Sequence, residues 1–161
     1  MKHFIYADNA ATTKLDPDAL EAAMPFLLDE YGNASQPYLF AKPAKEAIAD
    51  ARKTIAACIG AKPEEIYFTS GGTESDNWAI KGSAFSDKKK RTTITSEIEH
   101  HAILNACAAI ERHGFPVTYL PVTDEGVVQP KKLETYITDR TRLVSIMMAN
   151  NEIGTIEPIA E

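Results

Sequence analysis

The sequence predicts an α/β fold with three layers, in which helices cover both faces of a mainly parallel sheet. From residue 66 onward, short apolar runs typical of buried strands alternate with segments of helical periodicity. Strands separated by helices must cross over the sheet, and such crossovers join parallel strands. No internal repeat or low-complexity segment interrupts the alternation.

Two helices are expected before the alternating region. The first begins at Asp16-Pro17, a cap followed by proline at the first helical position, is kinked at Pro25 and ends at Gly32. The second begins at Pro43 and ends at Gly60. Apolar residues recur at helical spacing in both, at Leu20, Met24, Leu27 and Leu28 in the first and at Ile48, Ile55 and Ile59 in the second.

The alternating region is expected to contain strands and helices in regular succession. The strands are placed at residues 66–69, 92–95, 117–120 and 143–148, and the helices at residues 74–85, 102–113 and 130–137. Gly114 ends the second of these helices, and Asp124-Glu125-Gly126 forms a turn after the third strand.

Composition restricts the class of protein. The chain has 161 residues, enough for one domain with a hydrophobic core, and its hydrophobic (44%) and charged (25%) fractions are ordinary for a globular protein. Its net charge of −6 argues against nonspecific binding to nucleic acid or an anionic membrane, which needs a positive surface. The basic run from Lys88 to Arg91 is interpreted as a solvated turn. With two cysteines, no leader-like start and no apolar stretch of membrane-spanning length, the sequence predicts a cytoplasmic protein.

Distinctive polar segments follow three of the predicted strands. After the first, Gly71-Gly72-Thr73 opens a helix, where flexible glycines, free N–H groups and the helix dipole favour a phosphate. His100 follows the second strand, and Asn151 follows the last. Because ligands bind at the carboxyl ends of parallel strands, we expect a phosphate cradle, an imidazole and a carboxamide around one crevice.

Five stretches, in their order and spacing, resemble a known family. They are Tyr6-Ala7-Asp8-Asn9-Ala10-Ala11-Thr12-Thr13, Gly32-Asn33, residues 68–82, Glu99-His100-His101-Ala102 and Asn150-Asn151-Glu152-Ile153-Gly154. The chain resembles the amino-terminal part of class V aminotransferases, and among them the cysteine desulfurases of the NifS and IscS type. The resemblance extends over essentially the whole chain and well under half of a family enzyme. It implies a truncated large domain of the pyridoxal 5′-phosphate (PLP)-dependent transferase fold, which is aspartate aminotransferase-like.

The resemblance also implies an activity and its partners. The parent enzyme would convert L-cysteine to L-alanine and pass the sulfur to an enzyme persulfide for iron–sulfur cluster or thio-cofactor synthesis. A homodimer and a sulfur-acceptor protein are implied as partners. Residues 1–161 are expected to form a single partial domain, with residues 1–15 at the active-site mouth, 16–60 as a helical lead-in and 61–161 as the cofactor-binding portion.

The resemblance assigns the cofactor contacts. Gly72 and Thr73 would bind the PLP phosphate. His100 would stack on the pyridine ring and assist proton transfer as a catalytic residue, while Asn151 would hydrogen-bond the phenolic oxygen. Each position also has a plainer interpretation: a tight turn without a ligand at Gly72 and Thr73, a polar residue that opens a helix at His100 and a simple turn at Asn151.

Other reactive side chains are given structural interpretations. A metal site at Glu97, Glu99, His100 and His101 is not expected, because adjacent helical residues point about 100° apart. Cys58 and Cys107 follow apolar residues at helical spacing, so both are interpreted as small core residues. Neither matches the reactive cysteine of the family.

Two alternatives remain open. The first is another class V PLP enzyme, such as a selenocysteine lyase or an aminotransferase, because the phosphate cradle does not select the substrate. Ala34-Ser35-Gln36 and Ala41-Lys42-Pro43 depart from the family pattern in the loop at the entrance. The second is a non-catalytic α/β association module with an unpaired sheet edge.

We expect the 161-residue chain by itself to release no sulfide from L-cysteine. It ends at Glu161, before the family segments that carry the Schiff-base lysine, the aspartate that pairs with the pyridine nitrogen and the reactive cysteine. A colorimetric sulfide assay on the purified chain, with free PLP as the control, measures this directly. Sulfide release above that control would contradict the expectation.

Overall fold

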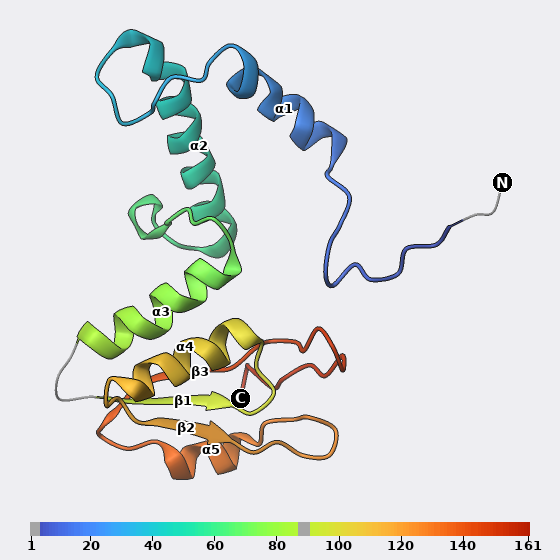
Figure 1. The fold of residues 1–161 in the computed structure, drawn as a ribbon, viewed down its shortest axis with the longest axis vertical. Coiled ribbons are helices and arrows are strands. Elements are labelled where there is room, and N and C mark those ends of the chain that lie inside the picture. Colours follow the sequence, from blue (N-terminus) through green and yellow to red (C-terminus); the bar gives the residue numbers. More distant parts are fainter. Residues whose placement is uncertain (1–3, 87–90) are drawn as a thin grey trace. The chain divides into compact units, whose positions relative to one another are not determined.

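The computed structural model describes residues 4–86 and 91–161 and is shown in Figure 1. The chain forms two compact units, Met1–Phe68 and Thr69–Glu161, which are described in turn. Lys88, Lys89 and Lys90 of the expected solvated turn lie outside the described residues. The polar segments at the predicted strand ends all belong to the second unit.

In the first unit, helix α1 (Pro17–Leu28) begins at the predicted position. Asp16 caps it, because its Oδ1 accepts a hydrogen bond of 2.9 Å from the Asp18 N–H. The helix ends at Leu28 and does not extend to Gly32, so the predicted helix end is wrong. Gly32 is buried, and a Cβ at this position would lie 2.4 Å from the Phe40 carbonyl oxygen. Close approach of the backbone therefore explains this glycine.

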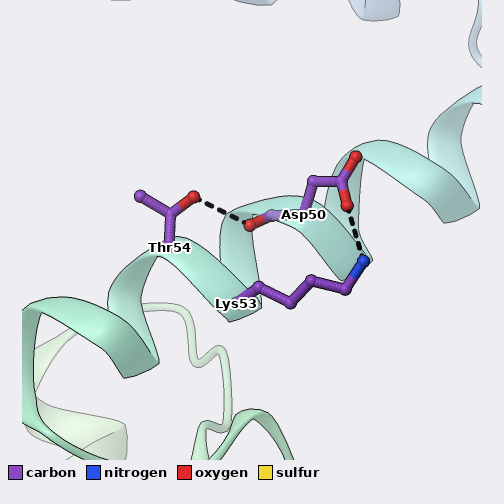
Figure 2. Close-up of polar contacts among 3 residues, drawn as sticks. All are labelled: Asp50, Lys53 and Thr54. Atoms are coloured by element: carbon purple, nitrogen blue, oxygen red, sulfur yellow. Dashed lines mark hydrogen bonds and ion pairs between the residues drawn. The ribbon is translucent and has the colours of Figure 1, made fainter.

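Helix α2 (Lys42–Ile59) is the longest element of the first unit. It ends at Gly60, whose φ of 67° lies in the left-handed region that favours glycine. Figure 2 shows the polar contacts on its exposed surface, where Lys53 Nζ lies 2.9 Å from Asp50 Oδ1 and the Thr54 hydroxyl donates to the Asp50 carbonyl over 3.0 Å. Two 3₁₀ turns, Leu39–Ala41 and Pro63–Glu65, flank α2.

Two predictions for this part of the chain are wrong. Cys58 is exposed, because α2 buries Ala56 and leaves its apolar stripe in solvent, with Ile59 67% exposed. Residues 66–69 do not form a strand. The Ile66 carbonyl, which a neighbouring strand would use, instead accepts a hydrogen bond of 3.1 Å from Arg52 Nε. The spacing of apolar residues did not show whether another element packs against α2 at Cys58, or whether a strand pairs with residues 66–69.

The second unit contains a parallel sheet. Its described strands are β1 (Thr92–Ser96), β2 (Val117–Leu120) and β3 (Thr141–Ser145), in the order β2-β1-β3. Both pairings of the central strand are parallel, and Ile94 lies opposite Thr118 on one side and Val144 on the other. All three strands therefore end at the same edge of the sheet.

Helices cover both faces of this sheet (Figure 1). Helices α3 (Gly72–Ser86) and α4 (His101–Arg112) lie together on one face, and α5 (Pro130–Tyr136) lies on the other. Two apolar clusters fill the layers: Ile80, Ala84, Ile103, Ala106, Cys107 and Ile110 between α3 and α4, and Ile94, Leu120 and Val128, with the partly buried Leu133 of α5, on the opposite side.

The observed architecture confirms the predicted three-layer α/β fold with a parallel sheet. The strand predicted at 143–148 is shifted, because β3 ends at Ser145. Beyond it the Met147 N–H donates to the Glu99 carboxylate over 2.8 Å instead of continuing the ladder. Across residues 4–86 and 91–161, no helix combines the length and apolar character needed to cross a bilayer.

The cluster between α3 and α4 should dominate the stability of the second unit. Ile110 is completely buried there, so Ile110→Ala is expected to lower the free energy of unfolding by about 2–5 kcal/mol through lost burial and a cavity. Ile156→Ala, at a position 73% exposed, serves as the matched control and should cost about 0.5 kcal/mol or less. Urea unfolding followed by circular dichroism measures both. Equal losses would show that this cluster is not the core.

Candidate functional site

The carboxyl ends of the strands and the starts of two helices meet on one side of the second unit. In Figure 1 the arrowheads of β1 and β2 lie on the same side as the amino-terminal ends of α3 and α4. The connections that leave β1 and β3 here are residues 97–100 and 146–156. In parallel α/β sheets this edge is where ligands bind.

His100 caps the start of α4. Its Nδ1 accepts a hydrogen bond of 3.1 Å from the Ala102 N–H, and its backbone is extended, with φ −57° and ψ 145°. In a neutral imidazole, a ring that accepts at Nδ1 carries its proton on Nε2. The plainer interpretation of His100, a polar residue that opens a helix, is thus present in the structure.

Asn150 holds the connection after β3 in place. The side chain is 8% exposed, and its Nδ2 donates to the Ile98 carbonyl over 2.8 Å. Its Oδ1 accepts from the N–H groups of Glu152 and Ile153 at 2.8 and 3.0 Å. Asn151, which is exposed, lies within this turn. The predicted turn at the second asparagine is therefore present and is built by the first.

His100 and Asn151 line the same hollow, whose volume is about 240 Å³. Its other lining residues come from the connections after β1 and β3 and from the start of α4: Glu97, Ile98, Glu99, His101, Leu104, Asn150, Glu152 and Ile153. The structure thus brings together two of the three groups expected around one crevice. The hollow offers an imidazole and a carboxamide at the ligand-binding edge of the sheet.

Glu99 forms the buried floor of this region. Its Oε1 accepts hydrogen bonds from the Ser96 hydroxyl at 2.9 Å and from the Met147 N–H at 2.8 Å. Burial raises the pKa of Glu99 above the ordinary glutamate value, and these hydrogen bonds only partly oppose that shift. The charges of Glu157 and Asp76 raise the pKa further. The carboxylate therefore links the ends of β1 and β3.

The glycine-led helix start is also present. Gly71 precedes α3, Gly72 is its first residue, and a Cβ on either glycine would meet nothing within 4 Å. The Ser75 N–H donates to the Gly71 carbonyl over 3.2 Å, so the amides of Gly72 and Thr73 lie ahead of the first helical hydrogen bond. The two glycines thus leave open space beside this backbone, while the Glu74 carboxylate occupies the adjoining Ser70 N–H.

Thr73 lines a separate hollow of about 560 Å³ along α3, with Ser70, Glu74, Asn77, Trp78, Lys81, Gly82 and Phe85. The structure therefore does not bring Thr73 into the hollow of His100 and Asn151. Residues 66–69 form no strand of the sheet, so no strand delivers the start of α3 to the carboxyl edge. The charge of Asp76 on α3 nevertheless contributes to the raised pKa of Glu99.

Glu74 is an acidic residue in the first turn of α3. Its Oε2 accepts hydrogen bonds of 2.7 Å from both the N–H and the hydroxyl of Ser70. These bonds lower the pKa of Glu74, so the side chain stays ionised. The carboxylate satisfies the amide of Ser70 and leaves those of Gly72 and Thr73 for another acceptor.

Cys107 is buried in the cluster between α3 and α4, as predicted for a core residue. Burial raises its thiol pKa to about 11, so the side chain is a weak nucleophile. Among the described residues, no three His, Cys, Asp or Glu side chains come together as ligands for a metal ion. Neither observation points to a second candidate site among the described residues.

The sequence reasoning missed three residues that build the site. Glu99 and Asn150 stood inside the motifs but were assigned no role of their own. Gly126, assigned only to a turn, has φ 80°, and a Cβ there would lie 2.5 Å from Ile153 Cδ1. Glu99 directly precedes His100, and Asn150 directly precedes Asn151; a polar residue at these positions was the sequence signal that could have indicated their roles. Nothing in the sequence indicated the contact at Gly126.

Comparison with known proteins identifies the family. The aminotransferase class-V family model matches residues 5–161. The chain is 54% identical over 158 residues to a cysteine desulfurase IscS of Methanosarcina thermophila, covering 98% of this chain and 39% of that protein. It is 50% identical over 162 residues to a cysteine desulfurase IscS of Clostridium botulinum, covering 100% of this chain and 41% of that protein.

Solved structures agree with this assignment. A NifS-like protein matches with a TM-score of 0.91 and 43% identity, covering 94% of this chain and 42% of that one. A structure of SspA in complex with cysteine matches with a TM-score of 0.91 and 42% identity, covering 96% of this chain and 45% of that one. The chain belongs to the class V aminotransferase family. It spans about 40% of the length of the curated relatives it matches.

The raised pKa of Glu99 predicts how stability depends on pH. A carboxyl whose pKa is higher in the folded state than in the unfolded state stabilises the fold below its ordinary pKa of 4.5, and this contribution is lost as the pH rises through the raised value. From about pH 4.5 upward, the free energy of unfolding of the wild type should therefore fall relative to that of Glu99→Gln, which cannot ionise and can still accept from Met147.

Urea unfolding of both proteins across this pH range measures the effect. Glu97→Gln, a neighbouring exposed position, is the matched control and should run parallel to the wild type. Parallel curves for Glu99→Gln and the wild type would contradict a raised Glu99 pKa.

Proposed function

We propose that this chain forms part of the PLP seat of a cysteine desulfurase, with L-cysteine as the substrate of the whole enzyme. The observation that carries the proposal is the shared hollow of His100 and Asn151 at the carboxyl edge of a parallel sheet, and a glycine-led helix start in the same unit adds to it. The support from relatives is that proteins 54% and 50% identical to this chain are named cysteine desulfurase IscS.

The start of α3 suits the phosphate group of PLP. A dianion needs N–H donors and open space; the start of α3 offers the N–H groups of Gly72 and Thr73, and there is open space at Gly72. The Thr73 hydroxyl, exposed in the first turn, adds a donor that can rotate toward the phosphate. Gly72 and Thr73 are therefore the proposed phosphate-binding residues.

The hollow at the strand ends suits the ring of PLP. Because Nδ1 of His100 is held by the Ala102 N–H, the ring has a fixed position and presents a flat face and an Nε2 proton. Asn151 supplies a carboxamide that can donate to the phenolic oxygen without adding charge. His100 is the proposed catalytic residue, since its Nε2 can hold or give up a proton close to the ring.

The cofactor, when bound, withdraws electrons from the amino acid attached to it. The residues of this chain bind and orient it: Gly72 and Thr73 at one end, His100 and Asn151 at the other. We further propose a homodimer, a sulfur-acceptor protein as partner of the whole enzyme, and a reducing compartment such as the cytoplasm. The last fits Cys58 and Cys107, which are both free thiols.

Two substitutions test the two ends of the proposed seat separately. Thr73→Val removes the hydroxyl and should weaken binding of both inorganic phosphate and PLP about tenfold, the value of a hydrogen bond to a charged group. His100→Ser removes the ring, but serine still caps α4. It should therefore weaken PLP binding about tenfold and leave phosphate binding unchanged.

Isothermal titration of the full chain with PLP and with inorganic phosphate measures both affinities. Thr54→Val, which removes an exposed helical hydroxyl on α2, is the matched control for Thr73→Val. Wild-type affinities for PLP in both site variants, or PLP binding no tighter than phosphate binding by the wild type, would contradict the proposed seat.

A further inference from the structure

We propose that Asn150 is a positioning residue, which holds Asn151 and His100 in one geometry by joining the connections after β1 and β3. The inference rests on the proposed function, because the groups it positions are the proposed contacts of the PLP ring. Asn150 itself is not a catalytic residue, since its side chain is buried and turned to the backbone.

The hydrogen bonds of Asn150 use the whole carboxamide. Nδ2 donates to the Ile98 carbonyl at 2.8 Å and to Met147 Sδ at 3.4 Å, while Oδ1 accepts from Glu152 and Ile153. An amide has two N–H donors and two oxygen lone pairs, and each has a partner here. A side chain with every polar position satisfied inside the protein has one favourable orientation.

These bonds fix the two proposed ring contacts from one point. Asn151 lies between Asn150, which is buried, and Glu152, whose N–H is held by the Asn150 side chain. Ile98, whose carbonyl receives Nδ2, lies two residues before His100. A change at Asn150 is therefore expected to move the His100 imidazole and the Asn151 carboxamide through the backbone that carries them.

The surrounding backbone closes the same turn. The Asn150 N–H donates to the Thr155 carbonyl at 2.8 Å, and the Gly154 N–H donates to the Asn150 carbonyl at 3.0 Å. On the other side of the turn, Ile153 lies close to Gly126, where an added Cβ would be 2.5 Å from Ile153 Cδ1. The turn is thus held at its base by backbone bonds and at its tip by the Asn150 side chain.

We call the hydrogen bonds of the Asn150 side chain the Asn150 clamp: Nδ2 joins the connection after β1, and Oδ1 holds the turn after β3. Aspartate at this position removes the first and keeps the second. Asn150→Asp keeps an oxygen that accepts from Glu152 and Ile153, but it removes the donor to the Ile98 carbonyl and places a carboxylate against that oxygen. The link between the two connections is lost, while the turn can still form. Asn105→Asp, an exposed asparagine of α4, is the matched control for the charge change.

The first measurement needs no cofactor. Asn150→Ala removes both the donor to Ile98 and the acceptor for Glu152 and Ile153, so amide hydrogen exchange, followed by NMR on the full chain, should be at least tenfold faster at Glu152 and Ile153, with Ile94 of the central strand unchanged. Asn105→Ala, at an exposed position of α4, should match the wild type at all three amides. Wild-type exchange at Glu152 and Ile153, or equally faster exchange at Ile94, would overturn the positioning role, because the first shows no clamp and the second shows general destabilisation.

The second measurement tests whether the Asn150 side chain positions the proposed ring contacts, His100 and Asn151. In Asn150→Asp the affinity for PLP should fall about tenfold, while the affinity for inorganic phosphate, which needs only the start of α3, should stay within twofold. An equal fall for both ligands, or unchanged PLP affinity, would overturn the role at the ring. If wild-type PLP binding is no tighter than phosphate binding, the proposed function fails, and the exchange result alone then decides whether Asn150 holds the turn.

Discussion

Parallel pairing of β1 with both β2 and β3 is the constraint on which the site depends. It brings the carboxyl ends of all three strands to one edge, so segments as distant in sequence as residues 97–100 and 150–153 become neighbours. The pairing itself is supported from both faces, by the cluster that includes Ile110 and by the cluster that includes Ile94. The two apolar clusters thus hold the strands in the arrangement that brings the polar segments 97–100 and 150–153 together.

The edge of the sheet leaves backbone groups without ladder partners, and buried side chains supply them. Glu99 accepts from the Met147 N–H where β3 has ended, and Asn150 donates to the Ile98 carbonyl where β1 has ended. A buried carboxylate is costly unless it is hydrogen-bonded, which explains the two short bonds that Glu99 accepts. The buried polar groups therefore act as connectors between strand ends, and the exposed ones, His100 and Asn151, face the hollow.

Local signals predicted most of the second unit, because its elements follow from apolar periodicity and clear helix ends. The sequence indicated β2 and α5 nearly to the residue, and it placed His100 and Asn151 at neighbouring strand ends. The sequence-based prediction was wrong where the structure of a segment depends on which other segment it contacts. Residues 66–69 have the composition of a strand, yet the Ile66 carbonyl binds Arg52. Contacts such as Ile153 on Gly126 depend on tertiary geometry that no local pattern encodes.

His100 shows that a structural and a functional interpretation of one residue need not compete. Capping α4 requires an acceptor on the side chain, and an imidazole can accept at Nδ1 only if that nitrogen carries no proton. The cap therefore decides the tautomer and fixes the ring at the same time. Serine would cap the helix equally well but would leave no second nitrogen to face the hollow. The histidine therefore combines the cap with a ring at the hollow that Asn151 also lines.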